Sequence, residues 1–285
     1  MAQCVKMIGG DGDFIICALD GGSLLADVAR IHQLEPIVAS ALNRLLMTTA
    51  LIAATEKESD TSIAVSITGE AAVSKMVTFA CGDVLKGFCD MRFAVDGAVD
   101  KYGKLFDGGQ MTVTKQYANG MHSTGQAALV SGDIATDFTH YYIHSEQQAV
   151  LFVIDEAVSA DKTYCSAVML SLLPQADAAI AAQISERLDD FKNIAAQLAS
   201  GADLSTLLSK ICGALPHRLV EQRELSYRCD CSRQKMESAL ISIGLDDLTA
   251  LRDEDGSAEL NCHFCGQSYQ FDRADLEHLI EELHA

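Results

Sequence analysis

The length, composition and charge of this chain favour a globular protein and argue against a nucleic-acid partner. It has 285 residues, of which 49% are hydrophobic and 21% are charged. That is enough to bury a core and to form a second, smaller domain. With 21 basic and 40 acidic residues, its formal net charge is −19 and its pI is near 4.6. Most of its surface would therefore repel a phosphate backbone.

The sequence shows no pattern of a signal peptide or a membrane span. Its N-terminal part, MAQCVKMIGGDGDF, has one early lysine and no long apolar run. The longest apolar helical stretch, LLMTTALIAAT, is shorter than the roughly 20 residues needed to cross a bilayer. We therefore expect a soluble, cytoplasmic protein with no membrane partner. Thiols stay reduced in that compartment, so its ten cysteines should be free thiols or metal ligands.

Six of the cysteines occur singly among apolar neighbours, and free cysteine is among the most frequently buried residues. We expect these six to be buried small hydrophobic residues, with no role assigned by the sequence: Cys4, Cys17, Cys81, Cys89, Cys165 and Cys212.

Strand and helix patterns alternate over residues 1–175. Apolar residues recur at helical spacing in three segments, where we expect helices: 26–33, 35–57 and 133–147. Pro36 stands at the start of the second of these. Strands are expected in short apolar runs bounded by turn residues: 13–20, 61–69, 75–83, 84–90, 148–157 and 163–174. Short β segments and turns fill 108–132. The pattern predicts an α+β domain built on a mostly antiparallel sheet with packed helices.

Residues 176–226 form an amphipathic segment, which we interpret as a helical linker. Apolar residues mark one helical face from Asp177 to Ser200, and a second short helix is expected to end near Gly213 and Pro216. The apolar face must pack against something, and the sheet of the first domain is the available surface. The spacing alone is also typical of an ordinary core helix.

Four cysteines in two tight pairs define the segment 227–285. Cys229-Asp-Cys231 and Cys262-His-Phe-Cys265 are separated by 30 residues. A tetrahedral zinc site needs four such donors at about 2.3 Å, and the glycine after Cys265 is typical of a zinc knuckle. The spacing therefore predicts a zinc ion held by four thiolates, with His263 exposed. The same sulfurs could instead form two disulfides.

From Cys229 to the end, 13 acidic residues stand against four basic ones. A module this small and acidic is expected to need its metal in order to fold. Oxidation of the C-x-x-C pair would remove two ligands at once and unfold the module. The spacing leaves two hypotheses open: a permanent structural zinc or a redox switch.

Several segments resemble one known family. CDCS, then GLDDL, then CHFCGQSYQF is similar to the C-terminal module of the redox-regulated heat-shock holdases known as the 33 kDa chaperonin family. Upstream, YYIHSEQ, VLKGFCD and ARIHQLEPIVASALNRLLMTTALIA resemble other segments of that family. The similarity extends over nearly the whole chain, and the cysteine motif is its most specific part.

The resemblance implies an ATP-independent chaperone, not an enzyme, that is inactive while reduced and bound to one zinc per chain. Cys229, Cys231, Cys262 and Cys265 would be the zinc ligands. On oxidation Cys229 would pair with Cys231 and Cys262 with Cys265. The linker at 176–226 would then unfold and uncover apolar surface that binds unfolding client proteins, and the active form would be a homodimer.

Two other functions have weaker support in the sequence. A metallohydrolase would use His140, His144 and Glu146, but the general-base glutamate expected beside the first histidine is replaced by Tyr141. A zinc ribbon that binds nucleic acid would need a basic patch and stacking aromatic residues, which the acidic module lacks. A zinc ribbon with a static zinc and another binding role remains the alternative.

Overall fold

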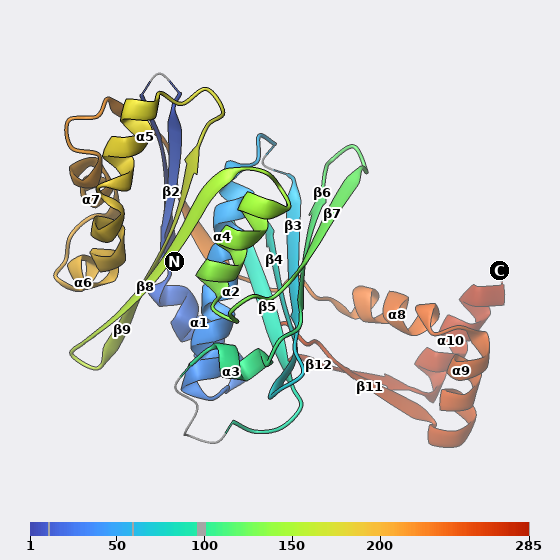
Figure 1. Cartoon of the computed structure of the whole chain (residues 1–285). Coiled ribbons are helices and arrows are strands. Elements are labelled where there is room, and N and C mark those ends of the chain that lie inside the picture. The colour runs from blue at the N-terminus through green and yellow to red at the C-terminus, as the bar shows by residue number, and fades with distance from the viewer. Residues whose placement is uncertain (11, 59, 96–100, 285) are drawn as a thin grey trace. The chain divides into compact units, whose positions relative to one another are not determined.

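The computed structural model describes residues 1–10, 12–58, 60–95 and 101–284 (Figure 1). The chain divides into two compact units, Met1–Arg228 and Cys229–Ala285. The segment that the sequence marks as a linker belongs to the larger unit. Each unit has its own apolar core.

The larger unit is built on a ten-stranded sheet with the order β7-β6-β3-β4-β5-β10-β1-β2-β9-β8. Every neighbouring pair is antiparallel except β5 and β10, which run parallel where Ser226 and Tyr227 meet Val84 and Leu85. The predicted α+β class with a mostly antiparallel sheet is confirmed. The strands are β1 (Ala2–Gly9), β2 (Phe14–Asp20), β3 (Ser62–Thr68), β4 (Val73–Cys81), β5 (Val84–Met91), β6 (Gln110–Gln116), β7 (His122–Ala128), β8 (Ala149–Ser159), β9 (Lys162–Leu172) and β10 (His217–Tyr227).

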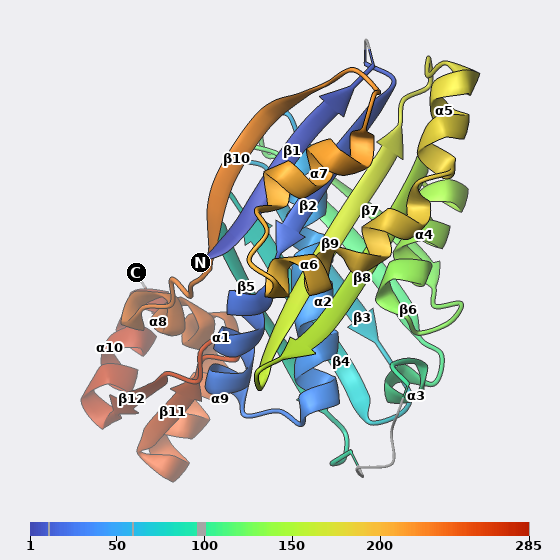
Figure 2. The ribbon, with the colours of Figure 1, turned by 90° about the vertical axis from the view of Figure 1, so that its left-hand side faces the viewer.

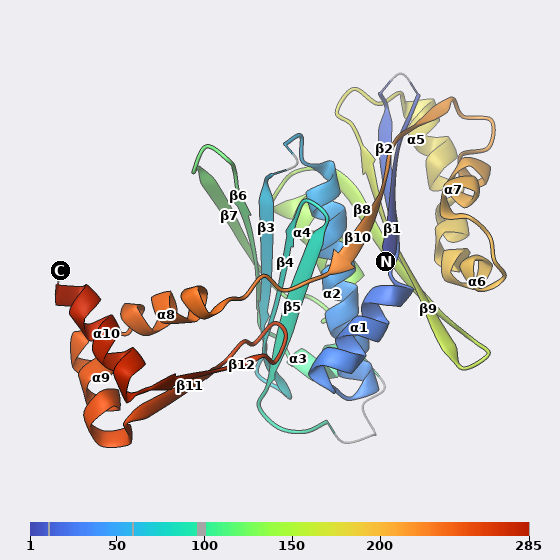
Figure 3. The ribbon, with the colours of Figure 1, turned by 180° about the vertical axis from the view of Figure 1, so that it is seen from behind.

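Helix α2 forms the centre of the main core. It contacts β3, β4 and β5 on one side and β2 and β9 on the other, so both halves of the sheet pack against it (Figure 3). Pro36 opens the helix at a position where its missing N–H leaves no hydrogen bond unmade. The helices on this face of the sheet are α1 (Gly22–His32), α2 (Pro36–Thr55), α3 (Gly103–Phe106) and α4 (Ile134–His144).

Helix α2 is longer than the apolar stretch recognised in the sequence. Its 20 residues and mean hydropathy of 1.6 make it long and apolar enough to cross a membrane by those two measures alone. However, 89% of its most apolar window is buried inside the protein, because it packs against strands from both halves of the sheet. It is therefore a core helix, as in a soluble protein.

A second apolar core lies on the other side of β1, β2 and β9, beneath four short helical segments (Figure 2). We call these segments the covering helices: α5 (Ala178–Ser185), the 3₁₀ segment η1 (Leu188–Asn193), α6 (Ile194–Ala199) and α7 (Leu204–Cys212). The strands contribute to this core Val5, Met7, Phe14, Ile16, Ala18, Val168 and Leu170. The covering helices and the turn after them contribute Ile184, Phe191, Ile194, Leu198, Leu204, Leu207, Leu208, Ile211, Cys212 and Leu215. The prediction that an amphipathic segment packs on the sheet is confirmed for the covering helices, but the helical assignment is wrong for residues 217–226, which belong to strand β10 of the sheet itself.

The covering helices are broken where the sequence indicated one continuous helical face. A 3₁₀ segment between α5 and α6 changes the number of residues per turn and so the direction in which later side chains point. Arg187 lies at this break, and its Nη1 donates a hydrogen bond to the carbonyl of Ile211 at 2.9 Å. This bond ties the break to the end of α7.

Two polar contacts attach the covering helices to the strands. The Asp155 carboxylate of β8 accepts a hydrogen bond from the Ala195 N–H at 3.0 Å, and Asp13 accepts one from Asp177 N–H at 2.9 Å. Partial burial raises the pKa of Asp155, although the hydrogen bond from the Ala195 N–H opposes that effect. The apolar contacts beneath the helices are therefore the main part of the attachment.

The smaller unit has a core of only six buried side chains: Leu240, Leu248, Phe271, Leu276, Leu279 and Ile280. Its elements are α8 (Arg233–Ser242), α9 (Leu245–Ala250), the π-helical turn η2 (Leu251–Asp255), β11 (Ser257–Asn261), β12 (Ser268–Asp272) and α10 (Arg273–His284). Ser232 caps α8 by accepting a hydrogen bond from the Lys235 N–H. A core this small is consistent with a unit that needs an additional source of stability.

The expectation for the six scattered cysteines is confirmed for four and wrong for two. Cys4, Cys17, Cys165 and Cys212 are buried, and burial raises the pKa of the Cys17 thiol to about 12. Cys81 and Cys89 are only partly buried. Cys81 ends β4 and Cys89 lies near the end of β5, where the apolar cover is incomplete.

Candidate metal centre

The four paired cysteines are carried by two irregular segments of the smaller unit. Cys229 and Cys231 lie in the extended chain just before α8, and Cys262 and Cys265 lie in the turn between β11 and β12. In that turn the Gly266 N–H donates to the Cys262 carbonyl at 2.7 Å, and the Cys262 N–H donates to the Gln267 carbonyl at 2.9 Å. Gly266 has a φ of +73°, a conformation that glycine adopts without strain. The knuckle expected from the sequence is therefore formed.

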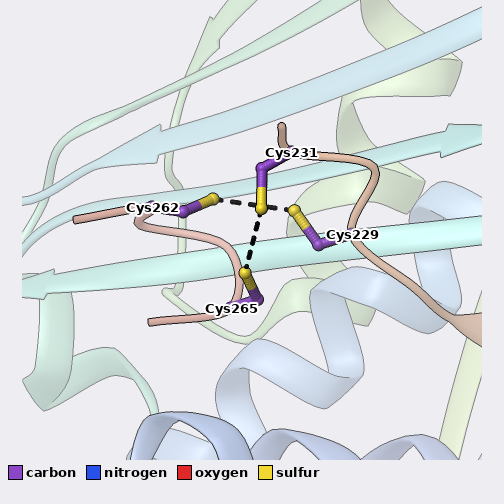
Figure 4. Close-up of side chains that lie close together, drawn as sticks. All are labelled: Cys229, Cys231, Cys262 and Cys265. Carbon is purple, nitrogen blue, oxygen red and sulfur yellow. Dashed lines mark hydrogen bonds between the residues drawn. The ribbon is translucent and has the colours of Figure 1, made fainter. Parts of the chain in front are cut away.

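The four sulfur atoms converge on one point (Figure 4). All lie within 4.8 Å of one another; the Cys231 and Cys265 sulfurs are 3.4 Å apart, and the Cys229 and Cys262 sulfurs are 3.6 Å apart. A tetrahedral zinc ion with bonds of about 2.3 Å would have sulfur atoms about 3.8 Å apart. The donor set and its spacing thus fit a zinc ion, and all ten cysteines are free thiols in this structure.

Both of these contacts join a sulfur of one pair to a sulfur of the other pair. Each short segment therefore supplies two donors that face the two donors of the other segment. This arrangement closes the smaller unit around one point, because the chain before α8 and the β11–β12 turn are far apart in sequence. A bound metal ion would hold these two segments together.

The hydroxyl group of Tyr269, on β12, donates a hydrogen bond to the Cys231 sulfur at 3.2 Å. Burial acts to raise the pKa of Cys231, but hydrogen bonds from Tyr269 and Cys265 outweigh it and lower that pKa. Burial raises the pKa of Cys229 to about 12 and also raises that of Cys265. Thiols with raised pKa values are protonated at neutral pH, so metal binding must release protons from them.

We expect Tyr269→Phe to weaken zinc binding by about tenfold to a hundredfold, because removing a hydrogen bond to a ligand has effects of that size. The phenyl ring keeps the packing and loses only the donor to Cys231. Competition with a chromogenic chelator would measure the change in affinity. Tyr227→Phe, which changes a tyrosine of the larger unit, serves as the control, and equal affinities for both variants would show that the Tyr269 hydroxyl does not support the ligand.

The sequence alone does not identify Tyr269 as a hydrogen-bond partner of a cysteine ligand. The segment SYQF that follows the knuckle is a short alternating strand, and such a pattern places its second residue on one face. The pairing of β12 with β11, in which Tyr269 lies opposite Leu260, is needed to show that the Tyr269 hydroxyl lies next to the Cys231 sulfur.

The other candidate metal ligands do not join this cluster. His263 is exposed, as expected. His140 and His144 are neighbours on α4 of the larger unit, but the Glu146 carboxylate accepts a hydrogen bond from the Tyr141 hydroxyl. Within the described part of the chain, the four cysteines are the only set of three or more potential ligands close enough to hold one ion. The geometry gives no support to a histidine–glutamate hydrolase site.

Together the fold and the cysteine cluster define an α/β protein with a large strand-and-helix unit and a separate four-cysteine unit that could hold a metal ion. Residues 2–272 match the family model described as Hsp33 protein. The chain therefore belongs to the Hsp33 family and is a chaperone of that family.

Curated relatives support this membership along the whole chain. The chain is 31% identical to the 33 kDa chaperonin of Desulfotalea psychrophila over 98% of this chain and 97% of the relative. It is 30% identical to that of Streptococcus thermophilus over 99% of this chain and all of the relative. These relatives are named as chaperonins and not as enzymes.

A solved structure shares the fold. The 33 kDa chaperonin of Thermotoga maritima superposes with a TM-score of 0.85, at 20% identity, and 98% of each chain is covered. The fold of this chain is thus a known one.

Proposed function

We propose that this protein is a redox-regulated, ATP-independent holdase that is inactive when reduced and bound to zinc. The observation that carries the proposal is the convergence of four cysteine sulfurs within 4.8 Å in a unit with a very small core. In the reduced state Cys229, Cys231, Cys262 and Cys265 would hold one zinc ion per chain. Bound zinc would supply the free energy that keeps the smaller unit folded, of order 10 kcal/mol in zinc-finger peptides.

The switch is an oxidation of the ligands themselves. A peroxide or hypochlorous acid would accept two electrons from Cys262 and Cys265, which form one disulfide, and would be reduced to water or to chloride and water. Loss of two donors leaves a two-sulfur site that no longer satisfies a tetrahedral ion. Cys229 and Cys231 would then form the second disulfide by the same reaction. The sulfur contacts of 3.4 Å and 3.6 Å both join one pair to the other, so peptide mapping must test this pairing against a crossed one.

The effect on the larger unit would follow the chain. Cys229 comes two residues after the end of β10, and β10 is joined to the covering helices through the turn at Leu215. In the proposal, unfolding of the smaller unit removes an anchor from β10 and lets the covering helices detach. Detachment would expose the apolar residues of those helices together with Met7, Ile16 and Val168 beneath them.

Exposed apolar surface of this kind would bind unfolding client proteins and keep them from aggregating. We further propose that the active form is a homodimer in the cytoplasm and that neither nucleic acid nor membrane is a partner. Its net charge of −19 supports the absence of nucleic-acid binding.

The test compares reduced, zinc-loaded protein with protein oxidised by hydrogen peroxide under mildly unfolding conditions. We expect release of about one zinc per chain, loss of four free thiols, and suppression of light scattering by a chemically unfolded client. Oxidised, zinc-free protein that suppresses no more aggregation than the reduced form would overturn the switch. It would leave the static zinc ribbon with another binding role as the better interpretation.

A further inference from the structure

Two histidines on α4 lie outside the four-cysteine site and outside the apolar core. His140 and His144 occupy positions i and i+4, and their rings are 4.2 Å apart between centroids, tilted by 41°. Both side chains are exposed, whereas Phe138, Tyr141 and Tyr142 on the other side of the helix are buried. The helix thus presents two imidazoles side by side to solvent while its opposite face holds it to the sheet.

Neither imidazole is engaged by the rest of the protein. Among the described residues, neither His140 nor His144 has a hydrogen bond or ion pair, so their ring nitrogens face water. A histidine in a protein core usually has a hydrogen-bond partner that fixes its ring. For these two exposed histidines, the neighbouring group is the other imidazole ring. Two imidazoles one helical turn apart are the arrangement that lets both nitrogens reach one metal ion.

The position on the helix also favours a cation. His144 is the last residue of α4, and the C-terminal end of a helix carries a partial negative charge from unpaired carbonyl groups. A positive ion bound by the pair would lie close to that end. The strongly negative net charge of the chain adds a general attraction for cations.

The pair supplies two nitrogen donors, and among the described residues no third histidine, cysteine or carboxylate lies close enough to form a set with them. The Glu146 carboxylate accepts the hydrogen bond of Tyr141, whose ring is buried beneath the helix. Water would fill the remaining coordination positions. Imidazole suits borderline ions, with affinity rising from Ni²⁺ to Cu²⁺, whereas Mg²⁺ and Ca²⁺ prefer oxygen.

We propose that His140 and His144 form a second metal site on the surface of the larger unit, specific for borderline divalent ions such as Ni²⁺, Cu²⁺ and Zn²⁺. The site is separate from the four cysteines and is accessible while the protein is folded. It would not need the redox switch, and a failure of that switch would not affect it.

The experiment uses full-length reduced protein with zinc already bound to the cysteines, and Ni²⁺ as the probe. Ni²⁺ is paramagnetic, so we expect it to broaden the imidazole NMR signals of His140 and His144 before those of other histidines. Isothermal titration should give one binding event, and His140→Ala or His144→Ala should weaken it by at least about tenfold, as expected when a chelating pair becomes a single ligand. Zinc retained by the cysteines would be measured in each variant.

His278→Ala is the matched control, because His278 is also exposed on a helix and lies near Glu282 at i and i+4. It should bind Ni²⁺ as tightly as the original protein. The proposal is overturned if His278→Ala causes the tenfold loss, if the two α4 variants bind Ni²⁺ unchanged, or if broadening begins elsewhere. Both variants change exposed side chains, and an unchanged circular dichroism spectrum would show that they fold.

Discussion

Cys262→Ser should abolish zinc binding and leave the smaller unit unfolded even in the absence of oxidant. A serine hydroxyl is a poor substitute for a thiolate at a tetrahedral zinc ion, and Cys262 is the most buried of the four ligands, at 6% exposure. The lost metal-binding free energy is of order 10 kcal/mol in small zinc domains. Six buried apolar side chains are too small a core to replace it. Zinc content and limited proteolysis of residues 229–285 would measure the two effects.

Cys81→Ser is the control for this variant. Cys81 is also a free thiol, but it is partly exposed and ends a strand of the larger unit. It should keep its zinc and its protease resistance. If Cys262→Ser lost the metal but the smaller unit stayed resistant, that unit would fold on its own core, and the coupling between metal and fold would fail. If it kept one zinc at full affinity, the metal would be held elsewhere.

The sequence was most informative where structure depends on local pattern. The run from Pro36 to Thr55 is apolar at helical spacing and begins with a proline, so helix α2 could be recognised from it. The alternating and apolar runs of β3, β4, β8 and β9 were recognisable for the same reason. In each case the side chains that make the pattern are the ones that the core buries.

The strands β1 and β10 were not predicted, and β10 could not be recognised because its pairing is not local. Residues 217–227 read HRLVEQRELSY, and most of them are exposed, so no strand pattern is visible. β10 is a strand because it pairs with β1 over eight positions, although the two segments are about two hundred residues apart in sequence. The order of the ten strands likewise depends on contacts that no short window contains.

The cysteine site likewise has one part that the local sequence predicts and one part that depends on the fold. Two close pairs of cysteines can be seen in the sequence, and their convergence was predicted from ligand chemistry. The choice of Tyr269 as a partner of Cys231 depends on the register of β12 against β11, which is set by folding. Similarly, helical spacing predicted that residues near 180–211 would pack on the sheet. It did not predict the break at Arg187, where the apolar face of the helix changes direction between α5 and α6.

Phe191→Ala is expected to make the reduced, zinc-bound protein an active holdase. Phe191 lies in η1, is 1% exposed, and packs in the same core as Ile16 and Val168. Removing a buried phenyl ring typically costs about 3–5 kcal/mol in stability. Because this ring belongs to the core under the covering helices, most of that cost should fall on their attachment and not on the main core around α2. Hydrogen exchange over residues 178–212 and a client aggregation assay on zinc-loaded protein would measure both effects.

Lys192→Ala, at the neighbouring exposed position, should change neither measurement, since the one ion pair of Lys192 within the described residues is a surface pair with Asp189. The comparison separates the two halves of the proposed mechanism. Fast exchange in α5 to α7 with no chaperone activity would mean that detachment alone does not create a client-binding surface. Activity with zinc still bound would place the client-binding surface beneath or on the covering helices, and the cysteines would then act only as the trigger that releases them.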